Sequence, residues 1–139
     1  MVISFLATPA LPESACKSPA EDAKSVKSAK HGAKESPIVC DLSAFSKEER
    51  RRHDELGAMI PALKTGVHEL PDGYEFRFPS NAKMVALLAE WAEQEHRCCP
   101  FFDLDLRIEP EDGAVWLRLT GRPGTKDFIR EEGARWISD

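Results

Sequence analysis

Long apolar runs are missing from this sequence of 139 residues. No window approaches the ~20 apolar residues that a helix needs to cross a bilayer, so no membrane span is expected. A short apolar stretch at the start has no basic residues before it, and Pro9 and Pro12 interrupt it. A secretory signal needs a basic segment followed by an unbroken apolar one. The sequence therefore predicts a cytoplasmic protein.

An excess of positive charge is missing too. The formal net charge is −5, which repels nucleic acid and anionic lipid unless a local basic patch overcomes it. The one basic run, residues 50–52, is interleaved with acidic residues, a pattern typical of a solvated helix face with ion pairs. We therefore expect neither nucleic acid nor a membrane as a partner, and a metal ion or a small molecule instead. The oligomeric state is left open.

Cysteine is scarce, and its spacing does not suit disulfides. The four cysteines are Cys16, Cys40, Cys98 and Cys99, of which two are adjacent. Adjacent Cα atoms lie ~3.8 Å apart, closer than the ~4.4–6.8 Å that an unstrained disulfide prefers. Free thiols in the cytosol are the better interpretation, and Cys16 is assigned no role.

Large apolar side chains are nearly absent between Leu11 and residue 36. Lysine, alanine, serine, glutamate and proline dominate there, so folding this segment would lose chain entropy without a hydrophobic gain. We predict a disordered extension over residues 1–36. Residues 37–139 then form a single α+β domain, which is long enough to build its own core.

The first helix of this domain is predicted by its N-cap. Ser46 and Glu49 have the spacing of a capping box, which predicts a helix over about residues 47–60. Pro61 should kink or end this helix. The spacing of its apolar residues predicts the inward-facing side chains His53, Leu56, Met59, Ile60 and Leu63.

Two further helices and four strands complete the pattern. Asn81 caps a second helix that runs to about Arg97, and a last helix spans about residues 125–136. Apolar and polar residues alternate over four stretches: residues 67–70, 74–78, 104–108 and 115–119. Asp72-Gly73 and Asp112-Gly113 separate them in pairs, so we expect two hairpins with these glycines at positive φ.

The resulting order is α-ββ-α-ββ-α. Each hairpin has one apolar face and each helix one apolar stripe. The economical arrangement is a two-layer α+β fold, with a four-stranded antiparallel sheet of two hairpins and helices on one face.

The chemically informative segment lies at the end of the second helix. A helical wheel places Glu95 and Cys98 in the same stripe as Met84, Leu88 and Trp91, with Cys99 at its edge. Pro100 disfavours helical dihedrals at Cys99, so both thiols should lie at the helix C-terminus. That end of a helix raises a thiol pKa, whereas His96 and Arg97 would lower it on reaching the sulfurs.

Two neighbouring thiols favour a soft metal such as zinc, copper(I) or mercury(II). Cys40 or His53 would complete the shell if the first helix packs alongside, and zinc would also accept Glu95. The predicted metal ligands are therefore Cys98, Cys99, Cys40, Glu95 and His53. The leading hypothesis is a small thiol protein that binds a soft metal ion or an electrophilic metal species.

Two other interpretations stay open. In a thiol-dependent enzyme or redox protein, Cys98 or Cys99 would be the nucleophile or redox thiol, and Glu95 would exchange its proton or orient a substrate. In a non-catalytic interaction domain the cysteines are only buried packing residues, as free cysteine often is. A core-facing His53 is then hydrogen-bonded locally, and a nearby arginine or backbone amide satisfies Glu95.

Five blocks of the sequence resemble a group of short bacterial hypothetical proteins. They are residues 40–42, 49–53, 69–74, 95–102 and 116–121. The similarity covers about residues 38–136, and its most specific part is the Glu-x-x-Cys-Cys-Pro-Phe block that begins at Glu95. The resemblance implies a bacterial cytosolic origin and no particular reaction.

Overall fold

The computed structural model describes residues 34–139, so most of the predicted disordered extension lies outside the described residues. The helices and strands within this range, with 3-10 turns written η, follow in chain order: η1 (Leu42–Ala44), α1 (Lys47–Met59), η2 (Ile60–Leu63), β1 (Gly66–Leu70), β2 (Gly73–Phe78), α2 (Ala82–Cys98), β3 (Phe102–Ile108), β4 (Val115–Gly121), α3 (Thr125–Glu132) and α4 (Ala134–Ile137). None of the described helices has the length and apolar character needed to span a membrane.

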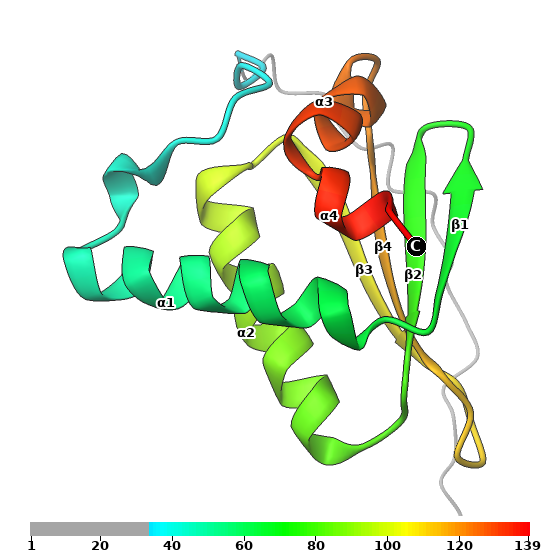
Figure 1. The fold of residues 1–139 in the computed structure, drawn as a ribbon. Coiled ribbons are helices and arrows are strands. Elements are labelled where there is room, and N and C mark those ends of the chain that lie inside the picture. The colour runs from blue at the N-terminus through cyan, green and yellow to red at the C-terminus, as the bar shows by residue number, and fades with distance from the viewer. Residues whose placement is uncertain (1–33) are drawn as a thin grey trace, which may run out of the picture. The chain divides into compact units, whose positions relative to one another are not determined.

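The four strands form one antiparallel sheet in the order β1-β2-β4-β3 (Figure 1). Each hairpin contributes an edge strand and a central strand, and β2 pairs with β4 in the middle of the sheet. Burial alternates along β2: Phe76 and Phe78 are buried on the helix side, while Arg77 is exposed on the other. The predicted two-layer α+β fold, with two hairpins and helices on one face, is confirmed.

The hairpin turns differ from the prediction by one residue. Leu70 pairs with Gly73 across the first hairpin, so Pro71 and Asp72 are the central turn residues and Gly73 already belongs to β2. Neither Gly73 nor Gly113 has a positive φ, and that expectation is wrong.

In the second hairpin, Gly113 N donates to Pro110 O (3.1 Å), and the residues between them, Glu111 and Asp112, have φ of 56° and 60°. Two successive left-handed residues are the signature of a type I′ turn. Asparagine, aspartate and glycine favour this conformation, but the pairing of the flanking strands decides which residues adopt it.

The local helix signals act as predicted. Ser46 Oγ accepts a hydrogen bond from Glu49 N (3.2 Å), and the Glu49 carboxylate accepts one from Ser46 N (2.8 Å), which completes the capping box. α1 ends at Met59, where the turn containing Pro61 continues as η2.

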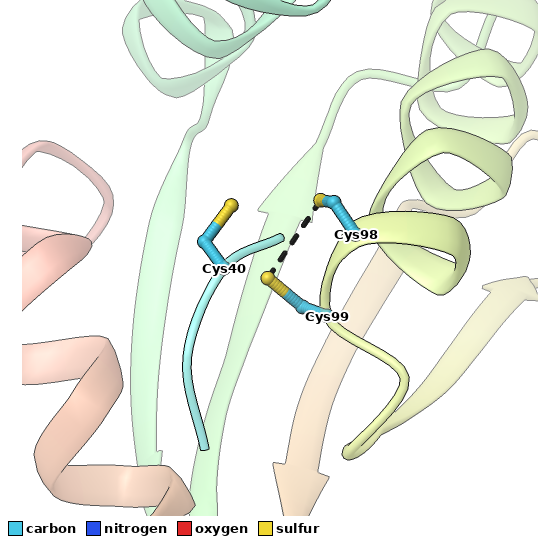
Figure 2. A group of neighbouring side chains, drawn as sticks. All are labelled: Cys40, Cys98 and Cys99. Carbon is cyan, nitrogen blue, oxygen red and sulfur yellow. Dashed lines mark hydrogen bonds between the residues drawn. The ribbon is translucent and has the colours of Figure 1, made fainter. Parts of the chain in front are cut away.

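Asn81 Oδ1 caps α2 by accepting from Met84 N (2.9 Å), and α2 ends at Cys98 beside the segment that carries Cys40 (Figure 2). The last helix is not continuous as predicted. Gly133 interrupts it with φ −102° and ψ 25°, because glycine is a poor helix former, and α3 and α4 result.

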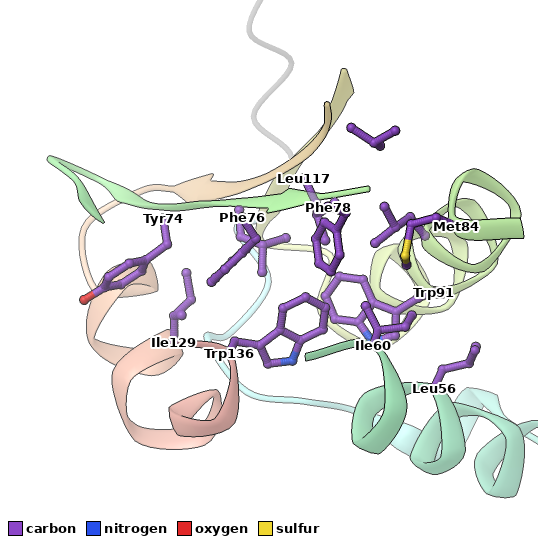
Figure 3. Close-up of a cluster of buried hydrophobic side chains, with 13 residues drawn as sticks. Leu56, Ile60, Tyr74, Phe76, Phe78, Met84, Trp91, Leu117, Ile129 and Trp136 are labelled. Carbon is purple, nitrogen blue, oxygen red and sulfur yellow. The ribbon is translucent and has the colours of Figure 1, made fainter. Parts of the chain in front are cut away.

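The main core fills the space between the sheet and the helices (Figure 3). Phe76 from the sheet packs against Trp136 from α4, with ring centroids 5.2 Å apart, and Trp91 from α2 contacts the same indole at 4.6 Å. Two of the residues predicted to face inward from the first helix, Leu56 and Ile60, are fully buried. The other apolar two, Met59 and Leu63, are exposed. Leu63 lies in η2, where the change from α to 3-10 geometry shifts the phase of the helix face.

Candidate metal and thiol site

The candidate site forms where the segment before α1 meets the C-terminal end of α2. Asp41 N donates a hydrogen bond to Cys98 O (2.9 Å), one of the carbonyl groups that the end of a helix leaves without an internal partner. This backbone contact helps to hold Cys40 beside Cys98 and Cys99. The sequence did not distinguish Cys40 from His53 as the third ligand beside Cys98 and Cys99. In the structure, both residues lie next to Cys98.

Three cysteine sulfurs gather at this point. The Sγ atoms of Cys40, Cys98 and Cys99 all lie within 4.8 Å of one another, and those of Cys98 and Cys99 are 3.7 Å apart (Figure 2). Cys98 and Cys99 are buried, whereas Cys40 is exposed. α2 ends between the two adjacent cysteines, since Cys99 has φ −127° and ψ 63°. All three are free thiols, as predicted.

A second cluster shares Cys98 with the first. Ligand atoms of His53, Glu95 and Cys98 also lie within 4.8 Å of one another. Glu95 Oε2 is 3.8 Å from Cys98 Sγ, and Glu95 Oε1 is 3.5 Å from His53 Nε2. The helical spacing of Glu95 and Cys98 thus brings them together, and α1 packs alongside α2 to add His53. The structure therefore brings all five predicted site residues to one place.

Gln94 is a member of this group that the sequence reasoning missed. It is buried, and its Oε1 lies 3.1 Å from His53 Nδ1, which orients the imidazole so that Nε2 faces Glu95. Gln94 lies beside the apolar stripe of α2, and glutamine there is ordinarily exposed. The proximity of α1, which is a tertiary contact, is what buries it.

The cluster concentrates negative charge on Cys98. The hydrogen bond with the Cys99 thiol, followed by the contact with the His53 imidazole, lowers the pKa of Cys98 to about 5 despite its burial. The same hydrogen bond with Cys98, together with burial, raises the pKa of Cys99. Burial, then the charge of Cys98, raises the pKa of Cys40 to about 12. The pKa of Cys98 is therefore the lowest of the three, and the two other thiols and the imidazole surround its sulfur.

The neighbouring acid and base respond to this thiolate. Burial, then repulsion from Cys98, raises the pKa of Glu95 to about 7. The contact with Cys98, then attraction to Glu95, raises the pKa of His53 against its burial. A thiol with a lowered pKa, an imidazole with a raised pKa and a carboxyl group with a pKa of about 7 therefore lie in contact.

Arg97 and His96, the two basic residues that would lower the thiol pKa on reaching the sulfurs, point to other partners or to solvent. Arg97 donates hydrogen bonds to Glu49 Oε1 (3.0 Å) and Ala44 O (3.2 Å), and its guanidinium lies 4.6 Å from the centre of the Phe45 ring. His96 is exposed. The basic side chain that lowers the pKa of Cys98 is His53, which comes from α1 instead.

A pocket of about 270 Å³ opens beside the site. Cys40, Cys99, His53 and Glu95 line it, and most of the other lining residues are apolar. The exposed Cys40 and the buried Cys99 both line this pocket.

Comparisons with protein families, with curated proteins and with solved structures found no match to this chain.

Proposed function

We propose that this protein binds a soft metal ion, or an electrophilic metal species, through the thiolates of Cys40, Cys98 and Cys99. The observation that carries this proposal is the gathering of three sulfurs within 4.8 Å, one of them from a distant part of the chain. Zn–S bonds of about 2.3 Å at tetrahedral angles place two sulfurs about 3.8 Å apart. The Cys98–Cys99 separation of 3.7 Å supports this geometry without rearrangement.

The chemistry of the donors supports the same conclusion. Thiolates select soft ions such as zinc, copper(I) and mercury(II) over hard ions. A metal ion displaces the protons of Cys99 and Cys40 on binding, as thiol ligands require, and stabilises the resulting negative charge. His53 and Glu95 lie next to the sulfurs, where they accept these protons or supply a fourth ligand for zinc. A cytoplasmic location, which keeps such thiols reduced, is part of the proposal, as is the bacterial origin that the resemblance implies.

Cobalt(II) titration under reducing conditions tests this function, because each bound thiolate adds sulfur-to-metal charge-transfer absorption. We expect one ion per chain and three thiolates, with zinc displacing the cobalt. Single Cys40→Ser, Cys98→Ser and Cys99→Ser variants should each lower the affinity by at least about tenfold. Cys16→Ser is the matched control, since it removes a thiol that is not assigned to the site. Parent-like affinity in all three site variants would contradict the proposal.

A thiol-dependent enzyme is the second candidate, and the pairing of Cys98 with His53 favours it. A thiolate beside an imidazolium is the arrangement that activates a cysteine nucleophile, and Glu95 would act as its acid or base. In the metal-free protein, an enzyme predicts that Cys98 is alkylated far faster than Cys99 and Cys40, and that zinc protects none of them. Metal binding predicts that one equivalent of zinc protects all three. An interaction domain predicts slow alkylation of Cys98 and Cys99 until the protein unfolds.

A further inference from the structure

The pocket beside the thiols is larger than a bare metal ion needs. An ion enclosed by three sulfurs occupies the space between them, whereas the pocket adds about 270 Å³. Cavities of about 150 Å³ with apolar walls are known to accept a benzene molecule. The available space therefore corresponds to a metal ion together with an organic group of about the size of a phenyl ring.

The walls away from the sulfurs suit such a group. The large apolar side chains that line them come from η1, α2, both strands of the second hairpin, α3 and α4: Leu42, Trp91, Phe102, Leu119, Phe128 and Trp136. Pockets for organic ligands combine a mostly apolar wall with a few convergent polar groups. Here four of the polar lining residues, Cys40, His53, Glu95 and Cys99, belong to the proposed metal site.

The charge of the pocket favours a cation. Three carboxylates, Asp54, Glu95 and Glu132, line it, and His53 is the one basic residue in the lining that the described residues form. A cationic metal species is attracted by these carboxylates. An organic anion of the same size would be repelled.

We propose that the ligand is a soft metal cation that retains one apolar organic group, with the metal on the thiolates and the organic group against the apolar walls. This inference rests on the proposed function and narrows it to a ligand class. Binding forms one metal–sulfur bond with a thiolate of the cluster and breaks the bond to the ligand that the metal brings, which leaves as an anion with its electron pair. The metal–carbon bond and the oxidation state of the metal are unchanged.

Phenylmercury and methylmercury are matched probes, because they share the metal and differ in the organic group. Each is titrated as its acetate in competition with glutathione, which sets a common thiol reference. We expect the parent protein to bind phenylmercury at least tenfold more tightly than methylmercury, relative to glutathione. Equal relative affinities, with zinc binding intact, would overturn the ligand class and leave the proposed function standing. Failure to bind zinc and both mercury compounds would overturn both.

Two variants locate the preference in the pocket. Leu42→Trp narrows the apolar end and should reduce the phenyl preference to nearly one, while methylmercury and zinc affinities persist. Leu63→Trp, at an exposed residue outside the pocket, is the control and should keep the preference. If Leu42→Trp does not fold, Phe128→Leu gives the same test, because the loss of an aromatic wall should also lower the preference. A full preference in the folded pocket variant would overturn the inference.

Discussion

Glu95 affects both the stability of the folded protein and the proton chemistry of the site. Its side chain is only 11% exposed, and the thiolate of Cys98 lies beside it, so ionisation is costly in the folded state. Part of that cost is offset by attraction to the His53 imidazole. A carboxyl group held in this way is poised to give or take a proton near neutral pH.

The raised pKa of Glu95 makes the stability of the protein depend on pH. The pKa of Glu95 is about 7 in the folded state, above the ordinary 4.5. The contribution of this carboxyl group to the free energy of unfolding is therefore fully present below pH 4.5 and is lost as the pH rises through 7. At 1.36 kcal/mol per pKa unit, the loss amounts to about 3 kcal/mol at most.

Glu95→Gln has no such ionisation. We therefore expect its free energy of unfolding to increase relative to that of the parent as the pH rises from 4.5 to 8. Urea denaturation at a series of pH values measures the difference. The substitution also removes the repulsion between the Glu95 carboxylate and the Cys98 thiolate, which adds to this gain at high pH. Glu93→Gln, at an exposed position on the same helix, should run parallel to the parent. A parallel curve for Glu95→Gln as well would show that Glu95 ionises freely.

At the scale of elements, the two hairpins meet along strands β2 and β4, whose backbones come very close together at Gly73. A Cβ atom at Gly73 would lie 1.9 Å from Leu119 O, across the β2–β4 pairing, which no side chain tolerates without movement of the strands. Glycine is required there by this close approach rather than by a positive φ. Gly66 in β1 has room, since its Cβ would meet only the Arg77 side chain at 3.6 Å.

Gly73→Ala and Gly66→Ala therefore form a matched pair within the first hairpin. We expect Gly73→Ala to destabilise the protein by about 2 kcal/mol or more, because overpacking forces the central strands apart. Gly66→Ala should be neutral or slightly stabilising, since it lowers the entropy of the unfolded chain. Thermal unfolding of both variants measures the effect. Equal melting temperatures would mean that β2 and β4 are not so closely paired.

At the scale of the whole described domain, the position of Cys40 depends on contacts remote from the sulfurs. Arg97 from α2 binds Ala44 O and the Glu49 carboxylate, and it stacks on Phe45, which packs in the same small cluster as Cys98 and Cys99. Arg122 at the other end contacts Ser36 and Glu35. The two arginines thus contact residues 36–44 at both ends, and this segment carries Cys40.

Arg97→Gln should weaken metal binding without removing a ligand. The variant loses the contacts that hold the segment of Cys40 against α2. The segment must then become ordered when the metal binds, and this loss of entropy reduces the free energy of binding. We expect the cobalt or zinc affinity to fall by about tenfold, in the range typical of residues that support metal ligands. Arg51→Gln is the control, because Arg51 is exposed on α1 and pairs only with glutamates of its own helix. An unchanged affinity in Arg97→Gln would show that Cys40 is held without this arginine.

The sequence by itself determined the features that depend on neighbours along the chain. Ser46 with Glu49, and Asn81, cap their helices through hydrogen bonds within three residues, and Pro100 ends α2 because of its own ring. The alternation of apolar residues predicted the strands and the buried face of the sheet for the same reason. Glu95 and Cys98 could be paired in advance, since helical geometry sets their spacing.

Only the tertiary structure decided the features that depend on elements far apart in the chain. The pairing of the strands moved both turns by one residue, and the packing of α1 on α2 buried Gln94 and brought His53 to Cys98. The backbone contact between Asp41 and Cys98 added Cys40. The elements that make these contacts are brought together by the burial of apolar surface, which is non-directional, so the pattern of residues predicted the layers but not which groups meet between them.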